Sequence, residues 1–160
     1  MSTMIENMGG KRKLESLRYS LEKLGLSTMH TLGTFAIIID NGGKVLLCHR
    51  TDRDAWNLPG GRVEAAETPW AAVVREVQEE VGLLVKVIAA IGIYAIPSRS
   101  DLVFTFRCEV VGGSLRTTEE ADEIQWYLPS ELPVNTFSSH VERIYDAYAG
   151  HSAVLLKTQD

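Results

Sequence analysis

Hydrophobic residues recur at helical spacing in the middle of the chain, between Pro69 and Val81. Thr68 is a favourable N-cap residue, and proline is well tolerated at the first helical position. Gly82 provides the expected helix end. The pattern therefore predicts an amphipathic helix over residues 69–81. Its apolar face is made by Trp70, Val73, Val74, Val77 and Val81.

Other apolar runs have the composition and punctuation of β-strands. The turn at Asn41–Gly43 predicts a hairpin between the first two strands, and Gly112–Gly113 predicts a second turn. The nearly unbroken apolar character of residues 83–96 and 101–111 predicts strands covered on both faces. The predicted strands are Thr34–Asp40, Lys44–His49, Trp56–Leu58, Leu83–Ile96, Asp101–Val111 and Ile124–Leu128.

The two ends of the chain each contain a further helical pattern. Residues 129–133 predict one short helical turn, and Ser139–Ala149 predicts a final helix. Near the N-terminus, Lys11–Leu26 predicts an amphipathic helix, which either packs on the domain or serves as a dimer-forming arm. Its apolar positions are Leu14, Leu17, Leu21 and Leu24. We therefore expect an N-terminal extension over residues 1–30 and one domain over residues 31–155.

Composition fits one globular domain of ordinary size, with 160 residues, 45% of them hydrophobic and 23% charged. The net charge of -5 argues against a nucleic-acid polymer or an anionic membrane surface as the main partner. A small anionic substrate is still compatible, because a bound cation reverses the local charge. Without a signal peptide or a membrane-length apolar run, we expect a cytoplasmic protein. Cys48 and Cys108 are expected to be buried thiols.

Three carboxylates share one face of the predicted central helix. Glu76, Glu79 and Glu80 stand at positions i, i+3 and i+4. The like-charge pair of Glu76 and Glu80 costs roughly 0.2–0.5 kcal/mol in an isolated helix, and Arg75 offsets only part of the charge. A hard divalent cation such as Mg²⁺ or Mn²⁺ would neutralise the rest. Considered alone, the helix fits a solvated acidic face better than a metal site.

The wider spacing decides between these interpretations. Gly61 is followed after five residues by Glu67, and after seven more by Arg75-Glu76-Val77-x-Glu79-Glu80-x-Gly82-Leu83. This pattern resembles the signature of the MutT-like Nudix hydrolases at every specified position. The resemblance extends from Leu32 to about Pro133 and includes the segment 56–61, Gly112–Gly113 and Trp126. It implies an α/β/α sandwich with a mixed β-sheet, in which the signature, or Nudix box, forms a loop–helix–loop.

The resemblance also implies a chemistry. Nudix hydrolases cleave a phosphoanhydride bond, typically in a nucleoside diphosphate linked to another moiety, with a divalent metal. The substrate would be a small nucleotide of the ADP-ribose, nucleotide-sugar or (d)NTP class, and the cofactor Mg²⁺, with Mn²⁺ as the alternative. Position by position, the implied metal ligands are the carbonyl oxygen of Gly60 and the carboxylates of Glu76, Glu79 and Glu80.

The remaining candidate residues have less specific roles. The general base is either Glu79 or a carboxylate of the acidic loop that follows, where Glu119, Glu120 and Glu123 are candidates. Glu67 and Arg75 would hold the loop and orient the carboxylates, with Glu64 as a further contributor. Candidate substrate-binding residues are Arg50, Arg53, Gly61 and Trp56. Aromatic residues that could stack on a base, unless they belong to the core, are Trp56, Tyr94, Phe104 and Trp126.

Two questions stay open. Pro97 lies close to where ADP-ribose hydrolases of this family carry a proline, but a proline in an ordinary turn explains it better. A non-catalytic nucleotide-binding sensor or regulatory module is the alternative to an enzyme. Such a module should lose carboxylates of the box, and this chain retains them all, which favours catalysis.

Overall fold

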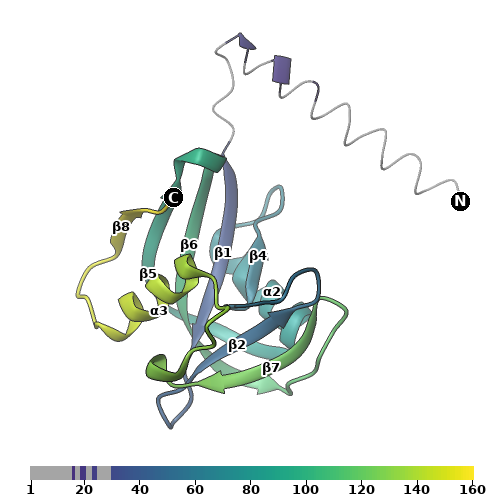
Figure 1. The fold of residues 1–160 in the computed structure, drawn as a ribbon, viewed down its shortest axis with the longest axis vertical. Coiled ribbons are helices and arrows are strands. Elements are labelled where there is room, and N and C mark those ends of the chain that lie inside the picture. The colour runs from purple at the N-terminus through teal and green to yellow at the C-terminus, as the bar shows by residue number, and fades with distance from the viewer. Residues whose placement is uncertain (1–15, 17–18, 21–22, 25–29) are drawn as a thin grey trace, which may run out of the picture. The chain divides into compact units, whose positions relative to one another are not determined.

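Five strands form a mixed sheet that runs through the domain (Figure 1). The structure, a computed structural model, describes residues 16, 19–20, 23–24 and 30–160. Strands β1 and β6 are parallel, as are β5 and β8, while β1–β4 and β5–β6 are antiparallel. In spatial order the strands are β4 (Gly60–Arg62), β1 (Thr31–Ile38), β6 (Asp101–Gly113), β5 (Leu83–Ile96) and β8 (Leu155–Thr158).

A second, antiparallel sheet has the order β3 (Ala55–Asn57), β2 (Val45–Arg50) and β7 (Ala121–Tyr127). The predicted turn between β1 and β2 is present, and the Asp40 carboxylate accepts hydrogen bonds from the backbone N–H groups of Gly42 and Lys44, both at 2.8 Å. The predicted hairpin is confined to this turn and one antiparallel bridge. Beyond the bridge between Ile39 and Val45, the two strands diverge into different sheets.

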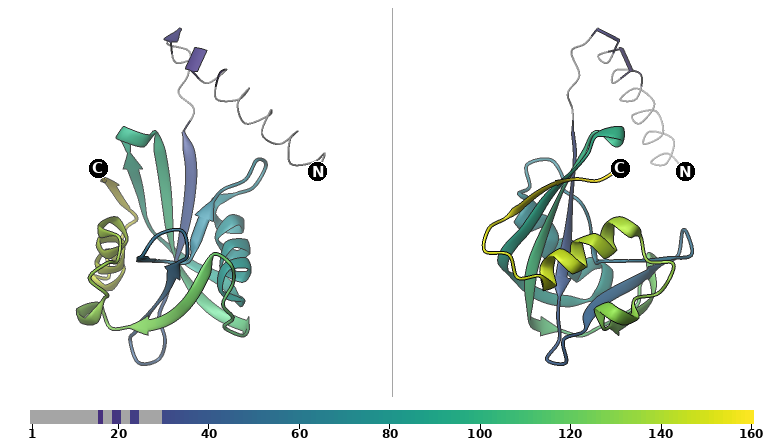
Figure 2. Two further views of the ribbon diagram at one scale, coloured as in Figure 1. Left: turned by 45° about the vertical axis from the view of Figure 1, so that its right-hand side comes forward. Right: turned by 60° about the vertical axis from the view of Figure 1, so that its left-hand side comes forward.

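Helices α2 (Pro69–Val81) and α3 (Ser138–Tyr148) cover opposite faces of the five-stranded sheet, as Figure 2 shows. Alternation along β1 creates both interfaces, because successive side chains of a strand point to opposite faces. Ala36 packs in one core cluster with Val77 of α2, and Ile37 packs in a second cluster with Ile144 of α3. The predicted α/β/α sandwich and its mixed sheet are thereby confirmed.

Several predicted boundaries are wrong. Strand β7 begins at Ala121, three residues earlier than expected, so Glu123 belongs to a strand and faces His49 of β2. Gly112–Gly113 form no separate turn, because they pair with the first residues of β5 as the end of β6. The helix α2 leads through Gly82 alone into β5, so the signature has no loop on that side. Strand β8 was not predicted.

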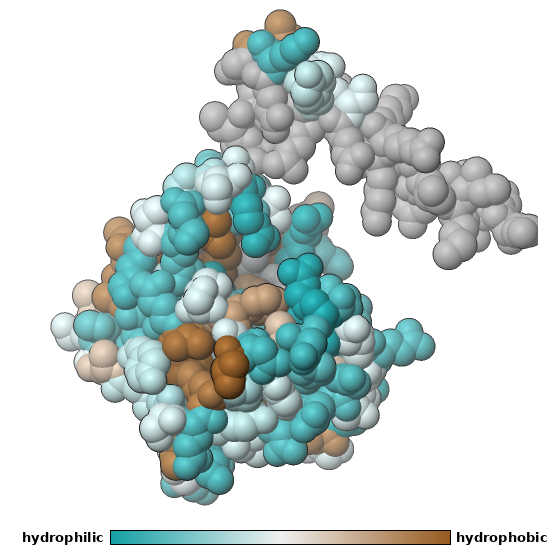
Figure 3. All heavy atoms as spheres, viewed as in Figure 1, coloured by the Kyte–Doolittle hydropathy of each residue, from teal (hydrophilic) through white to brown (hydrophobic). Residues whose placement is uncertain are grey.

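The two long strands are less covered than expected. Strand β5 exposes Leu84 and Ile88, and β6 exposes Val110 and Val111. Two short 3₁₀ turns connect the elements: η1 (Pro97–Arg99) joins β5 to β6, and η2 (Pro129–Glu131) matches the helical turn predicted after β7. On the face shown in Figure 3, hydrophobic residues form small patches on a largely hydrophilic surface.

Residues 31–160 form one compact unit. The helix predicted over Lys11–Leu26, with its alternative role as a dimer-forming arm, lies almost wholly outside the described residues. Cys48 and Cys108 are both free and buried, as predicted. No helix among the described residues is long and apolar enough to cross a membrane.

Candidate active site

Helix α2 holds the three carboxylates in place through well-defined ends. The hydroxyl of Thr68 accepts a hydrogen bond from the Ala71 N–H at 3.2 Å, Pro69 occupies the first turn, and Gly82 ends the helix in the left-handed conformation (φ 80°). The caps agree with the prediction. On the apolar face, Val73, Val77 and Val81 are fully buried, whereas Trp70 is 58% exposed and does not belong to it.

Arg75 donates hydrogen bonds to three carboxylates, those of Glu67, Glu76 and Glu79. Its guanidinium donates two parallel hydrogen bonds to Glu67, at 2.9 and 3.0 Å. It also donates to Glu76 and Glu79, both at 3.0 Å, and to the carbonyl oxygen of Arg62 at 3.1 Å. These bonds lower the pKa of Glu67 and raise that of Arg75. The bidentate pair fixes the loop between β4 and α2 against the helix.

Glu80 points in the opposite direction, into the domain, and only 9% of the residue is exposed. One carboxylate oxygen accepts a hydrogen bond from the Gly60 N–H at 2.9 Å, and the other lies 3.4 Å from the Sγ atom of Cys48. Burial, reinforced by repulsion from Glu76 and Glu120, raises the pKa of Glu80 to about 7. Burial likewise raises the pKa of Glu76. Among the described residues, no lysine or arginine forms an ion pair with Glu80.

The Gly60–Gly61 pair lets strand β4 approach both β1 and α2. Gly60 has φ 152°, and a Cβ atom there would lie 2.1 Å from the carbonyl oxygen of Thr34. A Cβ atom on Gly61 would lie 2.7 Å from the carboxylate of Glu76. Gly60 therefore requires glycine, because its Cβ atom would meet backbone atoms, whereas a Cβ atom on Gly61 would displace the Glu76 carboxylate. The close contact places backbone groups of β4 directly beside the helix carboxylates.

A cavity of about 420 Å³ opens between β4, α2 and the loops that follow β2 and precede β7. Glu76, Glu80 and Glu120 line it together with Arg50 and Arg62. An adjoining cavity of about 280 Å³ lies between α2 and the loop before β7. The larger cavity is lined by Arg50, Thr51, Asp52, Gly60, Gly61, Arg62, Glu76, Glu80 and Glu120. The smaller is lined by Glu76, Glu79, Glu80, Thr118, Glu119 and Glu120.

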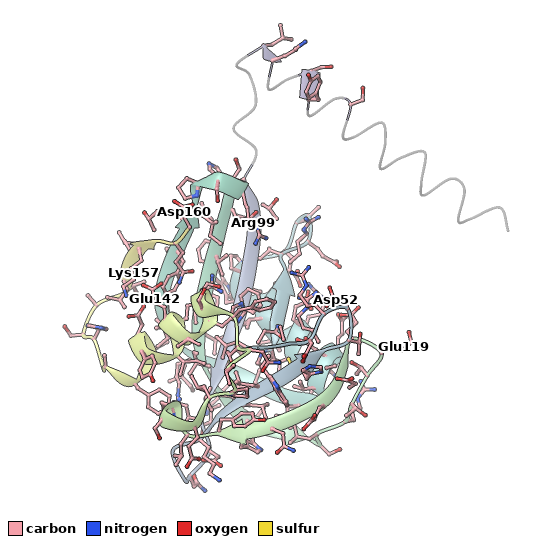
Figure 4. The ribbon with its side chains drawn as sticks, in the orientation of Figure 1. Asp52, Arg99, Glu119, Glu142, Lys157 and Asp160 are labelled. Atoms are coloured by element: carbon pink, nitrogen blue, oxygen red, sulfur yellow. The ribbon has the colours of Figure 1, made fainter. Side chains whose placement is uncertain are left out.

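The structure thus brings together most of the predicted site. Glu120, from the acidic loop, lines the same two cavities as Glu76 and Glu80, and Glu119 lines the smaller one with Glu79. Figure 4 shows Glu119 and Asp52 on neighbouring loops, which are joined by a 2.7 Å hydrogen bond from the Thr51 hydroxyl to the Glu119 carbonyl.

Other candidates lie elsewhere. Trp56 is buried in the second core cluster, edge-on to Tyr127, and lines neither cavity. Arg53 lies over the ring of Phe137 and also stays outside the cavities. Glu123, paired with His49 in the antiparallel ladder, does not line them either. Among the aromatic candidates for stacking, Tyr94 is fully buried and Phe104 packs against the first core cluster.

Sequence reasoning missed several residues of the cavity wall. Arg62 follows the two glycines in β4 and is one of the residues that line the larger cavity. Asp52 accepts two hydrogen bonds from Arg50, both at 2.7 Å, which also raises the pKa of Arg50. Thr118 donates to the carbonyl oxygen of Glu80 at 3.3 Å. The position of Arg62 after the glycines was a usable signal, whereas Thr118 is recognisable only in the folded chain.

The donor set of the two cavities suits a hard cation. Carboxylate oxygens prevail, and they come close together in a place where burial disfavours their negative charge. In the part of the chain that the structure describes, no three His, Cys, Asp or Glu side chains already converge as a metal-binding group. Arg75 holds Glu76 and Glu79 by one shared nitrogen, so these two carboxylates would turn to reach a common ion.

Comparison with known proteins agrees with this arrangement. The family model described as the NUDIX domain matches residues 29–148. The chain belongs to the Nudix family. A Bacillus subtilis (strain 168) Nudix relative, provisionally named an 8-oxo-dGTP diphosphatase, is 32% identical over 133 residues, which cover 82% of this chain and 89% of that protein. An ADP-ribose pyrophosphatase of Methanocaldococcus jannaschii is 34% identical over 140 residues, which cover 82% of either chain.

Solved structures share the Nudix fold. The crystal structure of a UDP-X diphosphatase superposes with a TM-score of 0.72, over 89% of this chain and 74% of that chain, at 23% sequence identity. At this identity the likeness bears on the fold alone, and it agrees with the sandwich described above. Family membership identifies the chain as a Nudix pyrophosphohydrolase.

Proposed function

We propose that residues 31–155 catalyse the metal-dependent hydrolysis of a phosphoanhydride bond in a small nucleotide. The observation that carries this proposal is the presence of both charges in one cavity. Glu76, Glu80 and Glu120 line it together with Arg50 and Arg62, and Asp52 lines it as the partner of Arg50. A pyrophosphate group needs positive charge around it, and here the carboxylates provide for a cation while the guanidinium groups provide for the phosphate oxygens directly.

The residues present fit a divalent cation, Mg²⁺ in the first instance and Mn²⁺ as the alternative. Glu76, Glu79, Glu80 and the carbonyl oxygen of Gly60 would hold it, because hard cations take oxygen ligands of this kind. When bound, the cation would neutralise phosphate charge and stabilise the attacking and leaving oxygens. Glu80 is held in position by the Gly60 N–H, and Arg75 orients Glu76 and Glu79 through its anchor on Glu67.

Proton transfer from the attacking water requires a carboxylate near the phosphate. Glu120 is the strongest candidate, because it lines both cavities and, among the described residues, makes no side-chain hydrogen bond or ion pair. Glu79 is the second candidate, although it is engaged by Arg75. Arg50 would turn from Asp52 to the substrate, since the pair lies at the cavity wall and a phosphate offers the same bidentate geometry as a carboxylate.

For the substrate we propose a nucleoside diphosphate linked to another moiety, with ADP-ribose as the first compound to test. The support is the ADP-ribose pyrophosphatase among the relatives, matched over most of both chains. The relative provisionally named for 8-oxo-dGTP makes oxidised and ordinary (d)NTPs the second class. Cleavage between the two phosphates of ADP-ribose would release AMP and ribose 5-phosphate.

The decisive experiment incubates the full chain with Mg²⁺ or Mn²⁺ and a panel of ADP-ribose, nucleotide sugars, NADH, diadenosine polyphosphates, (d)NTPs and 8-oxo-dGTP. Chromatography would separate the products. Glu80→Gln should lower kcat on the best substrate at least about a hundredfold, because it removes one charged ligand at a buried position. The matched control, Glu131→Gln in the exposed turn η2, should keep full activity.

Nucleotide binding without turnover under both metals would contradict the proposal and would favour the non-catalytic sensor. Equal losses in Glu80→Gln and Glu131→Gln would also contradict it, because the effect would then not depend on the cavity.

A further inference from the structure

Helix α3 covers the face of the sheet opposite to α2, yet its first turn contacts the segment that leads into the carboxylate site. The backbone N–H of Leu58 donates a hydrogen bond to the Nδ1 atom of His140 at 3.0 Å, and both residues are buried. Only Pro59 separates Leu58 from Gly60, whose N–H holds the Glu80 carboxylate. His140 is therefore connected to the site by a short stretch of backbone, although it lines neither carboxylate cavity.

This hydrogen bond continues a short ladder between β3 and the segment before α3. Trp56 and Thr136 form a parallel bridge. The Trp56 N–H donates to the Asn135 carbonyl at 3.2 Å, and the Trp56 carbonyl accepts from the Phe137 N–H at 3.1 Å. In a regular parallel ladder the next N–H, that of Leu58, would donate to the Phe137 carbonyl.

The Phe137 carbonyl is already occupied, because the chain turns into α3 at this point. It accepts hydrogen bonds from the N–H groups of His140 and Val141, at 2.9 and 3.0 Å. The imidazole of His140 replaces it as the acceptor for Leu58. Without the imidazole, the Leu58 N–H would be buried with no acceptor among the described residues, which is energetically unfavourable.

The surroundings of His140 suit it to this role. Burial, reinforced by the positive charges of Arg143 and Arg50, lowers the pKa of His140 well below its ordinary value. The imidazole is therefore neutral, and because a backbone N–H can only donate, Nδ1 is the acceptor and the proton is on Nε2. The ring lies edge-on to that of Phe35, with centroids 4.5 Å apart, and 5.7 Å from that of Phe137. These rings fix the direction of the acceptor.

The position of Leu58 also restricts that of Gly60. Pro59 between them has a restricted φ, and its carbonyl accepts a hydrogen bond from the Ala36 N–H of β1 at 2.9 Å. Gly60 is in close contact with Phe35, because a Cβ atom added to Gly60 would lie 2.7 Å from the Phe35 Cα atom and 2.8 Å from its Cδ1 atom. Leu58 therefore has little room to move without moving Gly60.

We propose that His140 is a positioning residue of the candidate active site. Its hydrogen bond to Leu58 fixes the backbone of Gly60, and the Gly60 N–H in turn orients the Glu80 carboxylate. The consequence for catalysis rests on the proposed function, in which the Gly60 carbonyl and the Glu80 carboxylate hold a cation. The effect of His140 on the Gly60 backbone does not depend on that reaction.

The test compares His140→Asn with His140→Leu in the full chain. The two new side chains have nearly the same shape, but asparagine offers an acceptor oxygen where histidine has Nδ1, and leucine offers none. Amide hydrogen exchange of Gly60 in EDTA reports on its backbone without metal or substrate. We expect this exchange to be at least about tenfold faster in His140→Leu than in His140→Asn, with the β5–β6 ladder amides as the reference for global stability.

Two further measurements connect the backbone to the site. The affinity for Mn²⁺, and kcat on the best substrate with Mg²⁺, should each fall about 10–100-fold in His140→Leu relative to His140→Asn. The control His151→Leu replaces an exposed histidine between α3 and β8 and should leave all three quantities unchanged. If His140→Leu does not fold, His140→Gln takes its place, and it should also fall short of His140→Asn because its acceptor lies one bond further from the backbone.

The inference would be overturned if the leucine and asparagine variants have the same Gly60 exchange rate, because His140 would then act by packing alone. It would also be overturned if the unmodified chain is active and His140→Leu keeps full kcat and Mn²⁺ affinity, a result that leaves the proposed function standing. If the unmodified chain cleaves no nucleotide, the proposed function fails, and the Gly60 exchange rates still support or overturn the role of His140.

Discussion

Glu80 combines an energetically unfavourable burial with its proposed role as a metal ligand. Its carboxylate is buried, has two hydrogen-bond donors and, among the described residues, no cationic partner, and its pKa is raised to about 7. A carboxylate in such a place is unfavourable until a cation is added. The ion pair of Arg75 and Glu67 is favourable without a cation, because the bidentate hydrogen bonds between them stabilise the charged form of both side chains.

In the metal-free protein, this raised pKa predicts a pH-dependent stability. The folded state holds the Glu80 proton up to about pH 7, whereas the unfolded chain releases it near the ordinary pKa of 4.5. The folded state therefore binds more protons between these values, and the free energy of unfolding falls as pH rises through this window, by at most about 3 kcal/mol. Glu80→Gln should remove that loss.

Chemical denaturation in EDTA at pH 5, 6, 7 and 8 measures the effect. Glu80→Gln should be more stable than the unmodified chain at pH 8 and nearly equal to it at pH 5. Adding Mg²⁺ at pH 8 should stabilise the unmodified chain and leave the variant unchanged. Parallel stability curves for the two proteins in EDTA would refute this account of Glu80.

At the scale of elements, the sequence correctly predicted the features that depend on interactions between neighbouring residues. Thr68, Pro69 and Gly82 act within one helix, and the prediction of α2 with both of its ends was confirmed. The roles of Gly61 and Gly82 could also be predicted from the sequence, because the spacing that carries the family resemblance includes both glycines. Trp70 was misplaced because helical spacing alone does not fix which side of a broad apolar face meets the sheet.

Non-local pairing explains the other errors. Strand β8 is four residues long and exposes Leu156, so its pattern is too weak to be recognised without its parallel partner β5. Strand β7 begins early because the ladder with β2 extends to Ala121, which is fully buried. That ladder divides the acidic segment: Glu119 and Glu120 stay in the loop beside α2, and Glu123 leaves it.

This division predicts different outcomes for two neighbouring carboxylates. Glu120→Gln should lower kcat about 10²–10⁴-fold, as expected for the loss of a general base, with a smaller effect on KM. Glu123→Gln, in the β2–β7 ladder, should leave kcat unchanged. The measurement is steady-state kinetics on the best substrate, with Glu79→Gln in parallel. Full activity of Glu120→Gln together with a comparable loss in Glu79→Gln would transfer the role to Glu79.

At the scale of the whole domain, the two faces of the sheet are stabilised in different ways. The face under α2 is an apolar cluster, whereas the face under α3 also contains a buried guanidinium, that of Arg143, which is 1% exposed. Its Nε and Nη2 atoms donate to the Gln159 carboxamide oxygen at 3.1 and 2.7 Å, and Gln159 in turn donates to Glu142. Beside this network Lys157 contacts Glu142 (Figure 4).

The network makes the last residues of the chain important for stability. Removing Gln159 would leave Arg143 buried with no hydrogen-bond acceptor among the described residues. Its pKa, already lowered to about 10 by burial, shows that the site disfavours an unpaired charge. Gln159→Ala should therefore cost about 3 kcal/mol. The comparison variant, Lys157→Ala in the adjacent strand β8, removes the ion pairs of a partly exposed ammonium with Glu142 and Asp146 and should cost less than Gln159→Ala, about 1 kcal/mol.

A second substitution tests whether Gln159→Ala is destabilising because a contact is lost or because a buried charge is left unpaired. Arg143→Met in the Gln159→Ala background removes the charge and leaves an apolar side chain between the rings of Phe35 and Tyr94. If the cost of Gln159→Ala comes from the unpaired guanidinium, the double variant should be more stable than the single one, because a buried polar group is costly mainly when its partner alone is missing. Urea midpoints of the unmodified chain, Gln159→Ala, Lys157→Ala and the double variant decide this. A double variant less stable than Gln159→Ala would show that Gln159 contributes chiefly by fastening β8 to the domain.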